Sequence, residues 1–308
     1  MSKIINLLKN ISPFNNRTEM PKPLYVIKVI LFFWLCKFGS EVIGEAIVLA
    51  VHFACGKNPL EGEMFDPKTI TLITYFGYAF IIGAIVLFWK LFQKKKIRDL
   101  GFTGKPVSCL AGAAIGTILV VVSTVAIVLT GTIRFYGVFD NIDTPMVAVM
   151  LICFVLQGAM EEILCRGVVH QLLIRKTSVP VTVGISAALF TIPHLSGMSG
   201  GLPLIVAAAI VNLILISVIF SLLTIRFKSI WAACGLHSIW NYILYSVLGL
   251  NLSGIDETAA SVFDMRSVGT SLLNGGEYGI EASIVTTIVL SVAMIMLFII
   301  TRKSLKKC

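Results

Sequence analysis

The sequence predicts an all-α membrane protein, a polytopic bundle of about eight transmembrane helices with both chain termini in the cytoplasm. Hydrophobic residues make up 57% of the 308 positions and charged residues only 13%, whereas a soluble domain carries about 25% charged residues. Apolar runs of about twenty residues, the length that crosses a bilayer as a helix, recur along the chain. The lipid bilayer is therefore the expected solvent of this protein, and an integral, multi-pass protein is expected.

Eight apolar runs carry the prediction of eight membrane helices, which together form one transmembrane domain over 25–301. The runs cover 25–53, 70–93, 107–130, 145–174, 179–195, 203–225, 229–250 and 282–301. The first and fourth runs are longer than a perpendicular crossing needs. We therefore expect these two helices to tilt or to protrude from the bilayer.

The basic residues between the runs orient the predicted helices. Lys and Arg cluster at every second junction, namely near the N-terminus and at 94–98, 175–176, 226–228 and 302–307. Cytoplasmic loops are enriched in Lys and Arg. We therefore predict a cytoplasmic N-terminal segment 1–24 with an amphipathic surface helix, a cytoplasmic tail 302–308, and an extracytoplasmic loop 251–281 that contains Asp256, Glu257 and Asp264. A prokaryotic plasma membrane is the expected location.

The remaining composition excludes two other classes of protein. The net charge is +9, but the basic residues form short clusters between apolar runs rather than one stripe, so no nucleic-acid partner is expected. The seven cysteines include no C-x-x-C pair, and most of them lie in apolar runs. They are interpreted as small buried hydrophobes, and neither a disulfide framework nor a zinc ribbon is predicted.

Charged side chains interrupt the fourth apolar run at Glu161, Glu162 and Arg166. A charged group at the centre of a bilayer costs about 2.5–3.5 kcal/mol on insertion scales. We therefore expect these charges either to be paired with one another or to have a function. Glu162 and Arg166 are four residues apart and can pair on one helix face. Glu161 points about 100° away and can face a cavity. Two carboxylates in different environments can separate acid and base roles; a buried structural ion network is the alternative.

Two further runs contain polar side chains at helical spacing. Phe190 and His194 are one turn apart in the fifth run, where Pro193 disturbs the helix, and His237 and Asn241 are one turn apart in the seventh. Each pair alone is compatible with structural hydrogen bonding between helices. If the three clusters converge, they supply a general base, its partner and hydrogen-bond donors for an oxyanion.

The three clusters resemble, in order, the motifs of the CAAX-protease and bacteriocin-processing family of intramembrane glutamic endopeptidases. The family's E-E-x-x-x-R, F-x-x-x-H and H-x-x-x-N motifs match Glu161-Glu162-…-Arg166, Phe190-…-His194 and His237-…-Asn241. The resemblance covers roughly 95–250 and, more weakly, 274–283. One departure is Cys165, where the family often has an aromatic residue.

The resemblance implies hydrolysis of a peptide bond in a membrane-associated peptide or a prenylated or otherwise lipidated protein. Glu161 and His194 would activate a water, and His237 and Asn241 would stabilise the tetrahedral oxyanion. The supporting residues would be Glu162, Arg166 and Phe190. Substrate identity and oligomeric state are left open by the sequence.

Zinc is the one cofactor that the resemblance makes it necessary to consider. Glu161, His194 and His237 are residue types that ligate zinc, but the sequence has no H-E-x-x-H motif. A water activated by glutamate needs no metal, so the expectation is a site without a cofactor.

Three other readings compete with this one. Gly197-Met198-Ser199-Gly200 matches the G-x-S-G of rhomboid serine proteases, although short Gly/Ser-rich matches arise easily. A transporter would explain Lys37, Glu41 and Glu45 on one face of the first run, but no internal repeat supports it. A non-catalytic scaffold or bacteriocin immunity protein is the third alternative.

The predicted depths of the histidines conflict with a single site. If each run were a straight helix, His194 would lie near the outer end of its span and His237 nearer the cytoplasmic side. Convergence therefore requires a fifth helix that is short, tilted or displaced, which Pro193 permits.

Overall fold

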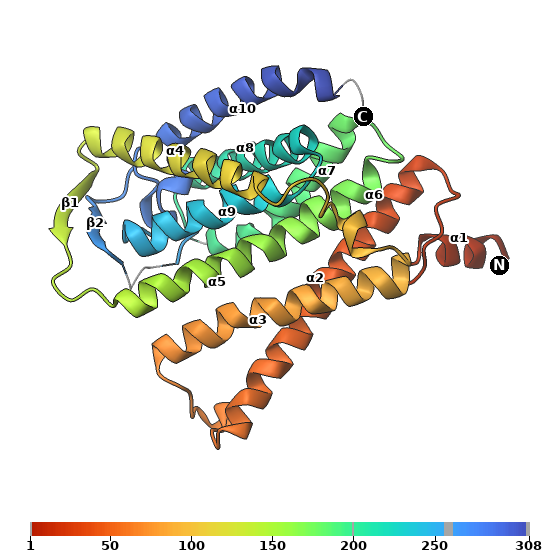
Figure 1. Cartoon of the computed structure of the whole chain (residues 1–308), viewed down its shortest axis with the longest axis horizontal. Coiled ribbons are helices and arrows are strands. Elements are labelled where there is room, and N and C mark those ends of the chain that lie inside the picture. Colours follow the sequence, from red (N-terminus) through yellow and green to blue (C-terminus); the bar gives the residue numbers. More distant parts are fainter. Residues whose placement is uncertain (1, 199, 256–260, 306–308) are drawn as a thin grey trace.

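The computed structural model describes residues 2–198, 200–255 and 261–305. Over these residues the chain forms a bundle of helices with a two-stranded antiparallel sheet at one end (Figure 1). The predicted all-α polytopic bundle is confirmed, and the small sheet is an addition that the sequence did not predict. Several residues used in the predictions lie outside the described part of the chain, namely Ser199, Asp256, Glu257, Lys306 and Lys307.

Every one of the eight apolar runs is helical. The corresponding helices are α2 (Lys22–Ala54), α3 (Pro67–Phe88), α4 (Ser108–Leu129), α5 (Thr144–Glu162), α7 (Val179–Thr191), α8 (Pro203–Phe227), α9 (Trp231–Tyr242) and α10 (Ile284–Leu305). The short helix α1 (Ser2–Ile11) is the one expected near the N-terminus, and α6 (Gln171–Leu173) extends the α5 segment.

Several helices continue in a different helical form. Single stretches of π-helix extend α3, α5 and α9 over Trp89–Gln93, Ile163–His170 and Ile243–Val247. A 3₁₀ segment, Ile192–Met198, extends α7. Shorter 3₁₀ turns lie at Pro59–Glu61, Ile97–Leu100, Gly276–Tyr278 and Ile280–Ala282. π-Helical stretches often occur at functional sites, and the one after α5 contains Arg166.

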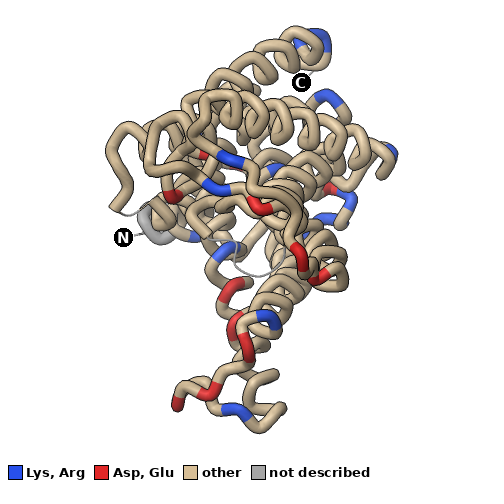
Figure 2. Tube along the Cα trace, turned by 90° about the vertical axis from the view of Figure 1, so that its left-hand side faces the viewer, with Lys and Arg blue, Asp and Glu red and all other residues tan. Residues whose placement is uncertain are grey.

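Six described helical segments are long and apolar enough to cross a membrane: Pro67–Gln93, Ser108–Leu129, Thr144–Leu173, Val179–Met198, Pro203–Phe227 and Ile284–Leu305. Large apolar side chains such as Ile288, Ile295 and Phe298 point outward from α10, a surface that suits lipid better than water. Charged residues are sparse over the bundle, while the hairpin that projects from it carries both acidic and basic residues (Figure 2). The total of eight spans and the cytoplasmic orientation stay predictions.

Helix α9 is the central element of the bundle and packs against α4, α5 and α8. Two glycines permit the close contact between α4 and α9. A Cβ atom at Gly112 would lie 1.8 Å from the carbonyl oxygen of Ala232, and one at Gly235 would lie 2.0 Å from that of Cys109. Small residues of this kind let membrane helices approach closely, and here they fix the helix that carries His237.

The α2–α3 hairpin and the two ends of the chain complete the arrangement. The outer parts of α2 and α3 project away from the other helices in Figure 1, and α1 lies toward the same end of the bundle as the C-terminal end of α10. At the opposite end, β1 (Ile133–Val138) pairs with β2 (Phe263–Ser267). The predicted loop 251–281 thus contains a strand, and its described parts lie over this end of the bundle.

Candidate active site

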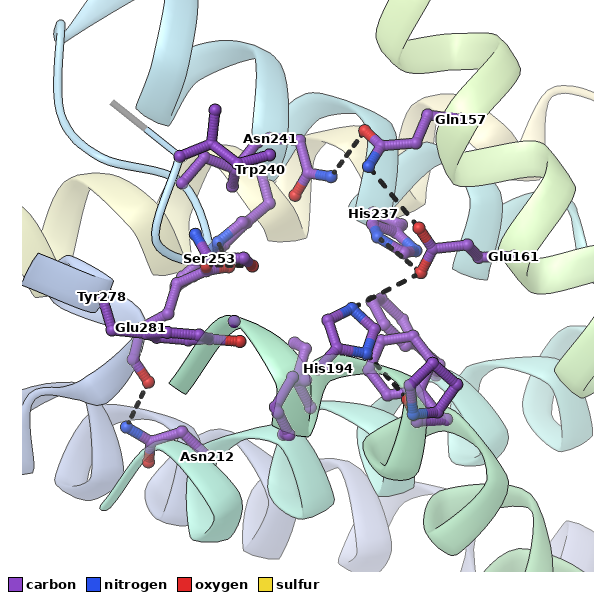
Figure 3. Close-up of a pocket in the computed structure, with 18 of the residues that line it drawn as sticks. Gln157, Glu161, His194, Asn212, His237, Trp240, Asn241, Ser253, Tyr278 and Glu281 are labelled. Carbon is purple, nitrogen blue, oxygen red and sulfur yellow. Dashed lines mark hydrogen bonds and ion pairs between the residues drawn. The ribbon is translucent and has the colours of Figure 1, made fainter. Parts of the chain in front are cut away.

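Glu161 lies at the centre of the residues that the motifs single out. Its Oε2 atom is 3.8 Å from Nε2 of His194 and 3.9 Å from Nε2 of His237 (Figure 3). The three residues come from the end of α5, the 3₁₀ segment after α7, and α9. Both distances exceed a direct hydrogen bond and are short enough to ask whether a water lies between the groups.

The second glutamate belongs to a buried ion network behind the first. Glu162 and Arg166 have no exposed side-chain surface, and Arg166 Nη1 donates to Glu162 Oε1 at 3.0 Å. Arg166 Nη2 also donates to the carbonyl oxygen of Ser217 at 2.9 Å and to its hydroxyl. The Glu161 side chain is 19% exposed. The predicted division into one carboxylate paired with Arg166 and one facing a cavity therefore matches the geometry.

Two phenylalanines enclose this network. The guanidinium of Arg166 lies 4.9 Å from the ring centroids of both Phe190 and Phe220. The ring of His237 stacks on Phe220 at 5.1 Å with an interplanar angle of 18°. These contacts fix the positions of the guanidinium and the imidazole, because cations and planar rings both interact favourably with an aromatic face.

His194 reaches the site, although a straight fifth helix would have placed it near the outer end of its span, away from His237. Helix α7 ends at Thr191, and the following 3₁₀ segment carries Pro193 and His194. Nδ1 of His194 lies 2.8 Å from the carbonyl oxygen of Phe190, so this nitrogen is the donor and Nε2 faces Glu161. The short, modified helix end that convergence required is therefore present.

Asn241 approaches Glu161 through Gln157. Asn241 Nδ2 donates to Gln157 Oε1 at 3.2 Å, and Gln157 Nε2 donates to Glu161 Oε1 at 3.5 Å (Figure 3). No role was predicted for Gln157 from the sequence. The available signal was its position one turn before Glu161 on the same helix face.

A cavity of about 300 Å³ opens beside Glu161, and its wall contains residues that the motifs do not include. Glu281 lies across the open space from Glu161 in Figure 3. It accepts hydrogen bonds from Trp240 Nε1 at 3.0 Å and from the backbone N–H and hydroxyl of Ser253 at 2.8 and 2.7 Å. Asn212 donates to the backbone oxygen of Glu281 at 2.9 Å. The carboxylate thus joins α9 to the loop segment at 253.

The comparisons with known proteins agree with the motifs. Residues 143–243 match the family model described as type II CAAX prenyl endopeptidase Rce1-like. The resemblance to the CAAX-protease family is confirmed. Comparisons with curated proteins and with solved structures gave no match. The CAAX-protease segment covers about a third of the chain, runs from the residue that caps α5 to the end of α9, and contains all three motifs. The match to this family model supports an intramembrane endopeptidase in general terms.

Elements outside the CAAX-protease segment also reach the site. A second cavity of about 160 Å³ lies on the α2 side of Glu161 and His194 and shares both of them with the first cavity. Its wall includes Lys37 and Glu41 from α2 and Tyr78 from α3. The two cavities therefore lie on either side of the predicted catalytic pair.

The protonation pattern around Glu161 restricts what can occupy the centre of the site. Nδ1 of His194 donates to a carbonyl, and Nδ1 of His237 lies 3.1 Å from the carboxylate of Glu162, so both rings direct Nε2 toward Glu161. In neutral rings these two nitrogens accept hydrogen bonds, as does the Glu161 carboxylate. Three acceptors converge, and a proton or a donor such as water must lie among them.

The structure also bears on the metal, serine-protease and transporter alternatives. Within the described residues, no group of three or more His, Cys, Asp and Glu side chains is arranged to hold a metal ion; the expectation of a metal-free site stays a prediction. The rhomboid-like motif falls on Ser199, which lies outside the described residues. Lys37 and Glu41 form the predicted ion pair, and Glu45 is exposed.

Proposed function

We propose that this protein is an intramembrane endopeptidase that hydrolyses a peptide bond with a water activated by Glu161 and His194. The single observation that supports this most strongly is the position of Glu161 Oε2, which lies 3.8 Å from Nε2 of His194 and 3.9 Å from Nε2 of His237 on the wall of a cavity. A water held there donates one proton to the Glu161 carboxylate and the other to Nε2 of His194, and it directs its lone pairs into the cavity. That is the orientation a nucleophilic water needs.

The first chemical step transfers a proton from the water to the protein. As the water oxygen bonds to the carbonyl carbon of the substrate, one proton passes to the Glu161 carboxylate, and the carbonyl oxygen becomes an oxyanion. His194 accepts a hydrogen bond from the water at Nε2, which lies close enough to Glu161 to help hold the transferred proton. The proton is then delivered to the leaving amine as the C–N bond breaks. General acid–base transfer of this kind typically contributes a factor of about 10²–10⁴ to the rate.

The oxyanion requires donors, and Asn241 and His237 are the two we assign. One N–H of the Asn241 amide is used by Gln157, and the second is directed to the oxyanion. His237 can donate from Nε2 only when both ring nitrogens carry protons, because Nδ1 already faces Glu162. Glu162 and Phe220 stabilise that form by charge and by stacking. Removing one oxyanion donor typically costs a factor of about 10²–10³ in kcat.

The lining of the larger cavity supports a membrane-associated substrate. Apolar side chains from α8, α9, α10 and the loop form much of its wall: Leu213, Ile216, Phe220, Trp240, Leu252, Ile255 and Leu290. A lipidated protein or a hydrophobic peptide fits such a lining better than a soluble, charged chain. A prenylated peptide ending in a CaaX-type sequence is therefore the first substrate to test.

The decisive experiment compares the wild-type chain with Glu161→Gln in proteoliposomes. We expect wild type to release a C-terminal fragment from a farnesylated CaaX peptide, and Glu161→Gln to lower that rate at least about 100-fold. Glu277→Gln is the matched control, because Glu277 is exposed and does not line the cavity; its rate should equal that of wild type.

The same pair of variants tests the proposal when the natural substrate differs from the peptide. Mass spectrometry of peptides released from membranes that contain each variant reports any cleaved product. Equal peptide profiles for wild type and Glu161→Gln, at equal expression, would contradict the proposal. They would favour a binding role without catalysis, such as a membrane scaffold or immunity protein.

A further inference from the structure

We infer that Lys37 is a specificity-determining residue that binds an anionic group of the substrate, a carboxylate, on the leaving-group side of the scissile bond. The inference rests on the proposed endopeptidase function and extends it to helix α2, outside the CAAX-protease segment. Two observations carry it, namely the charge distribution over the two cavities and the position of Lys37 relative to Glu161.

The charge distribution is asymmetric. Among the described residues that line either cavity, Lys37 is the only lysine or arginine. The larger cavity has carboxylates at both ends, Glu161 and Glu281, and the cationic partner of the buried network, Arg166, lines neither cavity. The smaller cavity also has two carboxylates, Glu41 and Glu161, but it adds the ammonium of Lys37. An anionic group therefore finds a cationic partner only in the smaller cavity, and unlike charges attract strongly where water is scarce.

The position of Lys37 relates it to the reacting bond. The smaller cavity shares Glu161, Phe190, Pro193 and His194 with the larger one. A peptide that crosses this shared wall has one end in each cavity, and an extended chain advances about 3.3 Å per residue. The apolar stretch of the substrate then occupies the larger cavity, and the segment beyond the scissile bond points toward Lys37. This gives the bound peptide a direction.

Lys37 retains capacity for a ligand although it already has a partner. An ammonium group has three N–H donors, and the interactions of the described residues account for one, to Glu41. The Lys37 side chain is 20% exposed, whereas its neighbour Phe38 is 57% exposed on the outer surface of α2 and Cys36 is fully buried. The orientation of α2 thus presents the ammonium to the cavity wall rather than to lipid.

A purely structural ion pair is the alternative explanation. A lysine and a glutamate four residues apart can neutralise each other inside a membrane without contacting a ligand. The two explanations differ in one measurable property: only a binding role makes affinity depend on the charge of the bound group.

The test uses two photoreactive probes and the full chain in detergent micelles. The probes are an N-acetylated apolar tripeptide whose first residue is benzoylphenylalanine, made with a free C-terminal carboxylate or with a C-terminal amide. Cross-linking yield against probe concentration gives an apparent Kd for each. We expect wild type to bind the acid at least about tenfold more tightly than the amide, the effect of one charge-assisted hydrogen bond.

The variants separate binding from structure. Lys37→Gln should bind both probes alike, Lys37→Arg should retain most of the preference, and Glu41→Gln should strengthen it by releasing the ammonium. Glu45→Gln, one turn further along α2 and exposed, is the matched control and should behave as wild type. The two probes can partition differently into micelles. This difference cancels when the ratio of the two apparent Kd values is compared between variants.

The inference is overturned if wild type prefers neither probe, binds neither, or shows the same acid-to-amide ratio as Lys37→Gln while both melt at the same temperature. Failure of the proposed function has a different signature. If the preference is present in wild type and in Glu161→Gln but no peptide is ever cleaved, the carboxylate site stands and the catalytic role falls.

Discussion

His237 Nδ1 lies 3.1 Å from Glu162 Oε1, and the same carboxylate oxygen accepts a hydrogen bond from Arg166 Nη1 at 3.0 Å. One buried oxygen therefore positions both a candidate oxyanion donor and the arginine behind it. The other carboxylate oxygen, Oε2, and Nε of Arg166 have no hydrogen-bond partner among the described residues. Arg166 has further partners in Ser217, but the hydrogen bonds that the described residues make to the Glu162 carboxylate all fall on this one oxygen, which makes the network sensitive to the loss of either charge.

Arg166→Met should destabilise the protein strongly. Removing one partner of a buried ion pair leaves the Glu162 charge uncompensated and typically costs about 3–5 kcal/mol. The loss is measured as a lower free energy of unfolding or a lower melting temperature in detergent. The double variant Glu162→Gln/Arg166→Met should recover part of this loss. Arg134→Met, at an exposed position in β1, is the control. Equal melting temperatures for Arg166→Met and Arg134→Met would contradict the expectation.

The sequence was sufficient to find this cluster because its signals are local. Glu162 and Arg166 are four residues apart, and a charged pair within an apolar run requires compensation whatever surrounds it. The depth of His194 was not predictable in the same way. Straight, perpendicular helices place it near the outer surface, and that estimate omits the change to 3₁₀ geometry after α7.

For other parts of the site, no local signal predicted which residues would be in contact. Trp240 and Glu281 are hydrogen-bonded across 41 positions of the chain, and no periodicity links a short 3₁₀ turn to a helix so far away. Lys37 was noticed as a charged residue in an apolar run, but its place beside Glu161 follows from how α2 packs on the bundle. Pairing within one helix can be predicted from spacing; contact between distant elements needs the fold.

Glu281→Gln should loosen the loop that covers the cavity. The carboxylate accepts three hydrogen bonds, from Trp240 and twice from Ser253, whereas an amide presents one oxygen and turns its NH₂ group toward a donor. An unsatisfied buried donor costs about 1–3 kcal/mol. Hydrogen exchange over 251–255 should accelerate about tenfold or more relative to wild type. Unchanged exchange, with Glu277→Gln as the matched control, would show that the carboxylate does not hold the loop.

Gly112→Ala should disturb the α4–α9 contact and, through α9, the position of His237. The new Cβ would lie 1.8 Å from the Ala232 carbonyl oxygen, so one of the two backbones must move. Overpacking of this kind typically costs about 1–3 kcal/mol. Gly83→Ala in α3, where nothing lies within 4 Å of the added atom, should leave melting temperature and peptide release unchanged. A stable, fully active Gly112→Ala variant would contradict the central role of this contact.

Protonation of Asp143 should weaken the start of α5 at low pH. Its side chain accepts a hydrogen bond from Lys68 and caps the helix by accepting from the backbone N–H of Met146 at 3.1 Å. These contacts, the one with Lys68 first, lower the pKa of the Asp143 carboxyl below its ordinary value. A lowered folded-state pKa means that the stabilisation is present above the unfolded-state pKa, about 3.9, and is lost as the pH falls through the folded-state value.

The melting temperatures of wild type and Asp143→Ala, followed from pH 7 to pH 3, check this sign. Wild type should melt higher at neutral pH by an amount that stays constant down to the unfolded-state pKa, because the carboxylate is ionised throughout that range. The difference should then shrink as wild type loses the charged cap, which the variant lacks at every pH. Asp140→Ala removes an exposed carboxylate three residues earlier and should show no such convergence. A difference between wild type and Asp143→Ala that persists undiminished at the lowest pH would mean that side-chain size, rather than the ionised cap, stabilises α5.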